Sequence, residues 1–125
     1  MHSGTRLAAV DLGSNSFRLE IARIDMGQLQ PMEYHKETVR QGADLDAERL
    51  LSQDAMQRGW SCLARFAERL AGFQPAQVRA VATQTLREAR NRDEFLSVAQ
   101  RILGFPIDVI AGREDTRLIY QGVAH

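Results

Sequence analysis

The chain begins with two strand-like segments that are separated by only a few small polar residues. Leu7 to Leu12 is a short, nearly continuous apolar run, which is typical of a central strand buried on both faces. Phe17, Leu19 and Ile21 then alternate with polar residues, which predicts a second strand. Because the intervening loop is short, the two strands are expected to form an antiparallel hairpin.

A third strand is predicted from Gln28 to Val39, after the turn signal Asp25-Met26-Gly27. Pro31 lies inside this segment and donates no backbone hydrogen bond, which indicates an edge strand or a bulge. The three segments together predict an antiparallel meander.

Two amphipathic helices follow in the sequence. The first is expected to be capped by Ser52 and stopped by Gly72. The second is expected to begin at Asn91, which forms an N-x-x-E capping pattern with Glu94, and to end at Gly104.

Two short strands, 78–82 and 106–110, alternate with these helices, and a last helix is expected from Gly112. The order β-β-β-α-β-α-β-α predicts an α/β domain with a mixed five-stranded sheet and helices packed on it. A chain of 125 residues is long enough for one such domain, which is expected to span 1–125.

The composition argues against several classes of function. Sixteen basic and sixteen acidic residues give a formal net charge of zero, so neither a nucleic-acid nor a polybasic membrane footprint is expected. No apolar run approaches the length of a membrane span, and residues 1–13 lack the long apolar core of a signal peptide. Cys62 is the only cysteine, which excludes an internal disulfide and suggests a small buried thiol. We therefore expect a cytoplasmic protein.

Three loops are expected to meet at one edge of the sheet. In open α/β sheets, ligands bind beyond the carboxyl ends of the strands. The strands at 7–12, 78–82 and 106–110 are predicted to be parallel neighbours, and the loops that follow them are 11–16, 83–87 and 112–117.

The first of these loops has two interpretations. Gly13 frees the backbone amides, and Ser14, Asn15 and Ser16 add small polar groups, which together suit an anion. Asp11, directly before them, could orient water or a metal ion. The alternative is a plain hairpin in which the glycine and asparagine supply left-handed backbone.

The other two loops also carry charged residues. Arg87 could clamp a phosphate bidentately. Glu114 and Asp115 fall in the first turn of the expected last helix, where they could compensate the helix dipole or activate a water molecule.

Four motifs in series carry a resemblance to a known family. They are AAVDLGSNSFRL, LARFAERLAGF, VATQTLREARN and FPIDVIAGREDTRLIYQGVAH. With them the chain resembles the N-terminal domain of the exopolyphosphatase and guanosine pentaphosphate phosphohydrolase family, within the actin-like ATPase superfamily. The resemblance implies an actin-like, ribonuclease H-like domain. It also implies hydrolysis of the terminal phosphate of polyphosphate or guanosine pentaphosphate, with Mg²⁺ and water.

The resemblance also implies roles for individual residues. The first phosphate loop corresponds to Gly13, Ser14, Asn15 and Ser16, with Asp11 as its acidic start and a possible metal contact, directly or through water. Arg87 is similar to the phosphate-contacting arginine of the family.

The segment that holds the general base departs from the family pattern. The family has a G-x-E-E-A-R segment, with the base on the glutamate before the alanine. The matching position here is Asp115, followed by Thr116 instead of alanine. Aspartate is one methylene shorter, and about 1 Å of misplacement costs on the order of a hundredfold in rate. Glu114 is therefore kept as a second candidate.

Parts of the family architecture are absent from these residues. The second domain of the family begins with an Asp-x-Gly-Gly-Gly-Ser phosphate loop, and no such segment occurs in the sequence. We expect the chain to be the first half of a two-domain catalytic unit, without the second domain or the C-terminal helical domains. The isolated chain is expected to be inactive, and the parent protein is expected to be a homodimer.

Two other functions stay open at this point. One is an ATP-using, kinase-like or Hsp70-like member of the same superfamily. The other is a non-catalytic domain that binds anions or mediates dimerisation.

Overall fold

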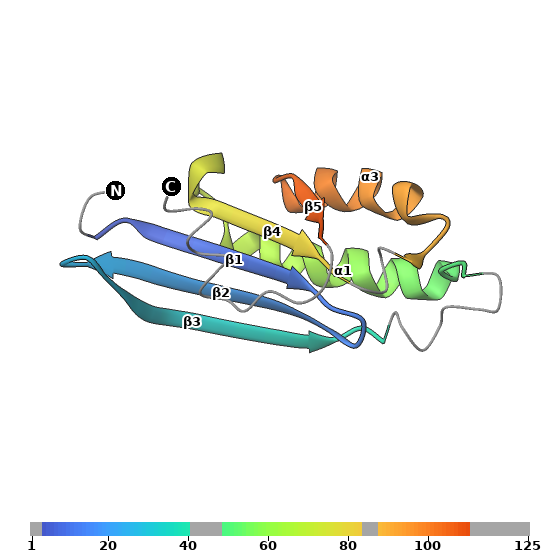
Figure 1. The fold of residues 1–125 in the computed structure, drawn as a ribbon, viewed down its shortest axis with the longest axis horizontal. Helices are drawn as coiled ribbons and strands as arrows, with labels where there is room; N and C mark the ends of the chain where they lie inside the picture. Colours follow the sequence, from blue (N-terminus) through green and yellow to red (C-terminus); the bar gives the residue numbers. More distant parts are fainter. Residues whose placement is uncertain (1–3, 41–48, 84–87, 111–125) are drawn as a thin grey trace.

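The computed structural model describes residues 4–40, 49–83 and 88–110. Five strands form one sheet in the order β3-β2-β1-β4-β5 (Figure 1). Their bounds are β1 (Arg6–Leu12), β2 (Ser16–Asp25), β3 (Gln28–Thr38), β4 (Val78–Ala82) and β5 (Ile107–Val109). Two helices, α1 (Gln53–Arg69) and α3 (Arg92–Leu103), and a short 3₁₀ turn, η1 (Pro75–Gln77), complete the described elements.

The predicted mixed sheet is confirmed. β1 pairs with β2, and β2 with β3, in antiparallel fashion, which makes the expected meander. β1, β4 and β5 are parallel neighbours, as expected for strands that are joined by helices. The last expected helix, from Gly112, lies outside the described residues.

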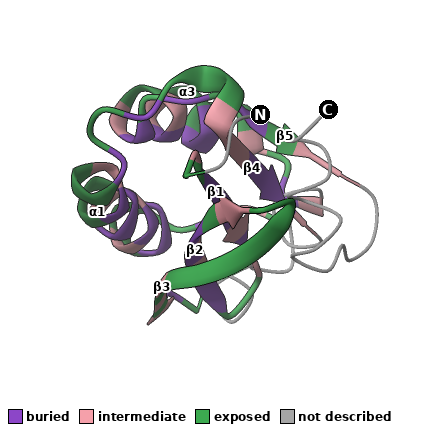
Figure 2. Cartoon of the chain, turned by 90° about the vertical axis from the view of Figure 1, so that its left-hand side faces the viewer, coloured by how far each residue is buried: buried purple, intermediate pink, exposed green. Residues whose placement is uncertain are grey.

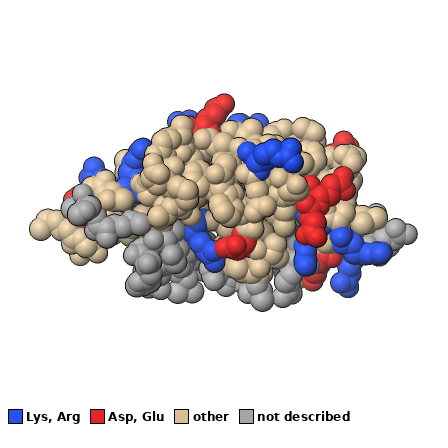
Figure 3. Space-filling model, turned by 90° about the horizontal axis from the view of Figure 1, so that it is seen from above, with Lys and Arg blue, Asp and Glu red and all other residues tan. Residues whose placement is uncertain are grey.

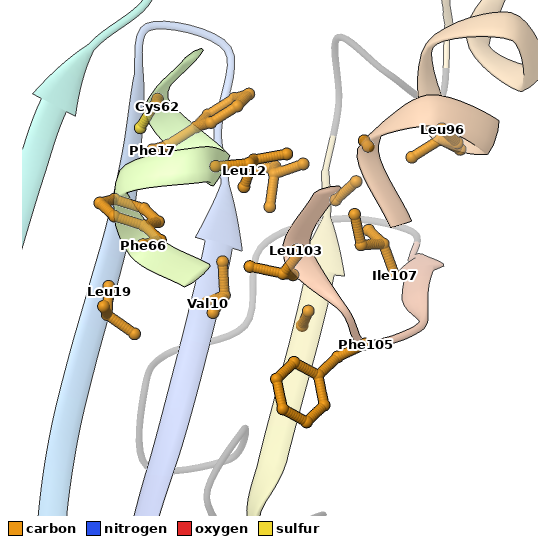
Figure 4. Packing of buried hydrophobic residues seen from close by; sticks show 14 of the residues in the cluster. Val10, Leu12, Phe17, Leu19, Cys62, Phe66, Leu96, Leu103, Phe105 and Ile107 are labelled. Atoms are coloured by element: carbon orange, nitrogen blue, oxygen red, sulfur yellow. The ribbon is translucent and has the colours of Figure 1, made fainter. Parts of the chain in front are cut away.

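The main core lies between one face of the sheet and the two helices (Figure 2). Side chains from alternate strand positions point toward the helices because successive residues of a strand face opposite sides. Figure 4 shows Val10, Leu12, Phe17 and Leu19 from the strands packing together with Phe66 of α1 and other apolar residues. Burial of each large side chain of this kind stabilises the fold by about 1.5–3 kcal/mol.

β1 is buried on both faces, as its continuous apolar run predicted. A second, smaller cluster on the other face of the sheet contains Leu7, Ala9, Ala22 and Val81. β1 is therefore a rigid central strand, and the loop that follows it starts from a fixed point.

β3 is the edge strand that Pro31 indicated, and it also contains a bulge. Its register with β2 shifts between Ile21 and Ala22, where Glu33 and Pro31 are the respective partners and Met32 is the extra residue. The strand is mostly exposed (Figure 2).

The helix ends confirm two predictions and correct a third. The Ser52 hydroxyl accepts a hydrogen bond from the Ala55 amide at 3.0 Å, and Gly104 ends α3 in a left-handed conformation. The expected Asn91–Glu94 capping pattern is wrong, because the Asn91 side chain makes no cap hydrogen bond. Its oxygen accepts from the Leu51 amide at 3.0 Å, and its nitrogen donates to the Leu51 carbonyl at 3.1 Å. The Asn91 side chain therefore pairs with both the N–H and the C=O of Leu51, whereas an N-cap side chain would accept from an amide in the first turn of its own helix.

Cys62 is a buried thiol, as expected. Burial, and after it the charge of Glu37, raises the pKa of the thiol to about 12. None of the helices in the described residues is long and apolar enough to cross a membrane.

Candidate functional site

The candidate site is the edge of the sheet at which β1, β4 and β5 end. The Thr83 amide donates to the Leu12 carbonyl at 3.2 Å, and the Ile110 amide donates to the Ala82 carbonyl at 2.9 Å. These hydrogen bonds hold the carboxyl ends of the three parallel strands side by side. The prediction that these ends share one edge is confirmed for the strands themselves.

The loop Gly13–Ser16 connects β1 to β2, and its backbone is tightly packed at Gly13. The Gly13 amide donates to the Ser16 carbonyl at 3.1 Å. A Cβ atom added at Gly13 would lie 2.9 Å from that same carbonyl oxygen, which is closer than real Cβ contacts. Any side chain at this position would therefore push the loop apart.

The backbone angles correct the expectation that the glycine and asparagine of this loop supply left-handed backbone. Positive φ angles occur elsewhere in the described residues, and neither Gly13 nor Asn15 is among them. The loop is a hairpin, but its glycine serves close backbone approach and not left-handed backbone. Close approach is also what a loop needs in order to bring its amides near an anion.

The polar side chains of the loop are placed differently from one another. Ser14 and Asn15 are exposed, whereas Ser16 is buried at 6% exposure as the first residue of β2. The Asn15 carbonyl accepts hydrogen bonds from the amides of Val39 and Arg40, at 2.9 and 3.0 Å. The loop is thereby fastened to the chain that leaves β3.

Asp11 lies at the base of the loop beside a cation. It pairs with Arg18 in the β1–β2 register, and the Arg18 Nη1 atom is 3.7 Å from the Asp11 Oδ2 atom. The Asp11 side chain is 22% exposed and that of Arg18 is 41% exposed, and the Asp11 Oδ1 atom is buried. The next partner in the same row is Lys36 on β3. One carboxylate and two basic residues thus share a cross-strand row near this end of the hairpin.

Sequence reasoning missed Arg18 and Lys36 as part of this edge. The signal was present, because pairing β1 and β2 around a short loop places Arg18 directly opposite Asp11.

The remaining predicted site residues cannot be placed against this geometry. Arg87, Glu114 and Asp115 lie outside the described residues, so their roles stay predictions. Of the second loop, Thr83 is described, and its hydroxyl lies 3.5 Å from the Leu12 carbonyl oxygen.

An open groove of about 420 Å³ lies between the end of β3 and α1, and sequence reasoning did not indicate it. Its lining includes Thr38, Val39 and Arg58, together with the ion pair of Arg65 and Glu37. The Arg65 Nε atom donates to both oxygens of Glu37, at 3.0 and 2.8 Å. These hydrogen bonds lower the pKa of the Glu37 carboxyl. The paired charges make the groove walls nearly neutral.

Charges of both signs are interspersed on the face shown in Figure 3, as the neutral composition predicts. On this face, the described residues form no broad surface of a single charge.

Fold and site together define the class of protein. A five-stranded mixed sheet in this order, with helices packed on it, is the actin-like ATPase fold. The model of the Ppx/GppA phosphatase family matches residues 20–125, and the chain belongs to this family. The matched region starts after the loop Gly13–Ser16.

Solved structures agree with this assignment. A Ppx/GppA family member from Aquifex aeolicus is 31% identical, with a TM-score of 0.79 over 86% of this chain and 35% of that chain. The type II variant of the Aquifex aeolicus Ppx/GppA phosphatase is 29% identical, with a TM-score of 0.80 over 90% of this chain and 38% of that chain. An exopolyphosphatase from Cytophaga hutchinsonii is 23% identical, with a TM-score of 0.80 over 86% and 35%, and supports the fold alone. The chain spans little more than a third of the length of these proteins.

Proposed function

We propose that this chain forms the first phosphate-binding wall of an exopolyphosphatase-type phosphohydrolase. The reaction would remove the terminal phosphate of inorganic polyphosphate or guanosine pentaphosphate by attack of water. The observation that carries the proposal is the tight loop Gly13–Ser16 at the common end of β1, β4 and β5, in a chain that belongs to a phosphatase family.

The loop would hold the phosphate through its backbone and its two exposed side chains. With only hydrogen at Gly13, backbone amides come close to an anion, and Ser14 and Asn15 add a hydroxyl and an amide. These donors lie at the end of a strand that is buried on both faces, so little reorganisation is needed when the phosphate binds.

Mg²⁺ is part of the proposal because the reacting group carries several negative charges. Among the described residues, no three His, Cys, Asp or Glu side chains gather into a metal cluster. The site does fit the sparse mode in which Mg²⁺ takes one or two carboxylates together with phosphate oxygens and water, with Asp11 as the carboxylate. When bound, the ion would neutralise charge on the phosphoryl oxygens. Arg18 would limit the direct contact of Asp11 with the ion and favour contact through water.

The proton-accepting role is assigned to Asp115, with Glu114 as the second candidate. Both assignments rest on sequence position within the family motif. Arg87 would add a fork of donors to the same phosphate. All three residues follow β4 or β5, whose carboxyl ends lie at the same edge as the loop.

The test is phosphate release from long-chain polyphosphate with Mg²⁺, by a protein in which this domain is joined to a second phosphate-loop domain. Asp115→Asn should abolish release while circular dichroism shows an unchanged fold, and Glu114→Gln is the matched control. Loss in Glu114→Gln alone would move the base to Glu114. Near-normal release by both variants would contradict the proposed function.

A further inference from the structure

Arg58 of α1 is connected to the loop Gly13–Ser16 by a short series of hydrogen bonds. Its Nε atom donates to the Val39 carbonyl at 2.9 Å. The Val39 amide donates in turn to the Asn15 carbonyl at 2.9 Å, and the Arg40 amide adds a second bond at 3.0 Å. Three segments that are distant in sequence are therefore linked through one residue, Val39.

Arg58 and Val39, the first two residues of this connection, are both held in place by packing. Arg58 projects from a helix whose neighbouring residues Ala55, Met56 and Cys62 are fully or almost fully buried against the sheet. Its own side chain is half-buried, so water competes less for the hydrogen bond than at an exposed site. Val39 is buried at 2% exposure.

These hydrogen bonds fix the orientation of the Asn15 carbonyl group. In a trans peptide the carbonyl of Asn15 and the amide of Ser16 lie in one plane and point in opposite directions. Two hydrogen bonds to this carbonyl therefore also fix the direction of the Ser16 amide, inside the loop proposed to hold phosphate. Arg40 has a positive φ of 53°, which a non-glycine residue adopts only when its surroundings hold it.

We propose that Arg58 is a positioning residue for the phosphate loop. By holding Val39, it sets the peptide plane between Asn15 and Ser16 and thus the presentation of the loop amides. The inference rests on the proposed function for its purpose, but the connection itself can be measured without any ligand.

The experiment compares ¹⁵N-labelled wild-type chain with Arg58→Gln, Arg58→Lys and Arg69→Gln. Arg69 is an exposed arginine of the same helix and serves as the matched control. In Arg58→Gln, the amides of Val39 and Arg40 should exchange with solvent about fivefold faster or more, and the amide shifts of Gly13–Ser16 should move. Arg58→Lys keeps a donor of similar reach and should recover part of the protection.

Two results would overturn the inference. One is a loop whose shifts and exchange rates in Arg58→Gln equal those of wild type. The other is an equal change in Arg58→Gln and Arg69→Gln, which would reflect general loss of charge on the helix.

Titration of the same samples with tripolyphosphate separates this inference from the proposed function. Weaker binding by about threefold or more in Arg58→Gln is expected, with Arg69→Gln unchanged. A wild-type chain that does not bind contradicts the proposed function, and the exchange rates alone then decide the role of Arg58. A wild-type chain that binds no better than Arg58→Gln, despite faster exchange in the variant, overturns the inference.

Discussion

At the scale of single residues, Gly13 is the position where the loop has least freedom. The hydrogen atom of this glycine occupies a place where a methyl group would lie 2.9 Å from the Ser16 carbonyl oxygen. The neighbouring Ser14 side chain is exposed and can be removed without such a conflict. The two positions therefore separate the shape of the loop from its side-chain chemistry.

Gly13→Ala should destabilise the chain by about 1–3 kcal/mol, because the loop must shift to accommodate the methyl group. Urea denaturation measures this change. Ser14→Ala is the control and should change the free energy of unfolding by no more than about 0.5 kcal/mol. Equal stabilities of wild type and Gly13→Ala would show that the loop is looser than the structure indicates.

The Cys62 thiol should make stability depend on pH in the alkaline range. Burial and the nearby Glu37 raise its pKa from an ordinary value of 9.0 to about 12. The unfolded chain loses this proton near its ordinary pKa, whereas the folded chain keeps it. The free energy of unfolding should therefore fall as pH rises from 9 toward 12, by up to about 1.4 kcal/mol per pH unit.

Comparison with Cys62→Ala isolates this contribution, because the other titrating groups are common to both proteins. The difference in urea stability between the two should shrink as pH rises above 9. A difference that stays constant up to pH 11 would contradict a raised pKa for the thiol.

At the scale of elements, Asn91 joins the start of α3 to the segment before α1. Its side-chain amide satisfies both backbone groups of Leu51, a buried residue. Asn91→Ala should cost about 1–3 kcal/mol, because the Leu51 amide and carbonyl lose their partners. Asn91→Asp keeps the acceptor for the Leu51 amide and should fall between wild type and Asn91→Ala in a urea titration. An Asn91→Asp variant as stable as wild type would argue for a capping role instead, because aspartate caps a helix as well as asparagine does.

Local patterns predicted most of the elements, because their causes are local. The alternation in β2, the Ser52 cap and the break at Gly104 each depend on residues a few positions apart. The role of Asn91 could not be predicted in this way, since its partner lies 40 residues earlier and the N-x-x-E pattern offered a nearer one.

The location of the candidate site could be predicted from the sequence, but the reasons for some of its residues could not. The common edge followed from strand order, and the loop from its glycine and small polar residues. The reason for Gly13 was missed, because close approach to the Ser16 carbonyl is a property of three-dimensional geometry. The Arg58–Val39 contact was missed for the same reason, since it joins residues 19 positions apart on separate elements.

At the scale of the whole molecule, the chain is proposed to form one phosphate-binding wall, and it covers only 35% and 38% of two solved members of the family. The sheet edge, the tight loop and family membership support one another. Binding of a phosphate chain at the loop distinguishes a functional phosphate-binding loop from one that only retains the fold.

The most direct measurement is a titration of the ¹⁵N-labelled chain with tripolyphosphate, followed residue by residue. The account predicts saturable chemical-shift changes centred on the amides of Gly13, Ser14, Asn15 and Ser16. In Gly13→Ala, the ligand should no longer cause these changes. Shifts scattered over surface arginines, or a Gly13→Ala variant that binds as wild type does, would contradict it.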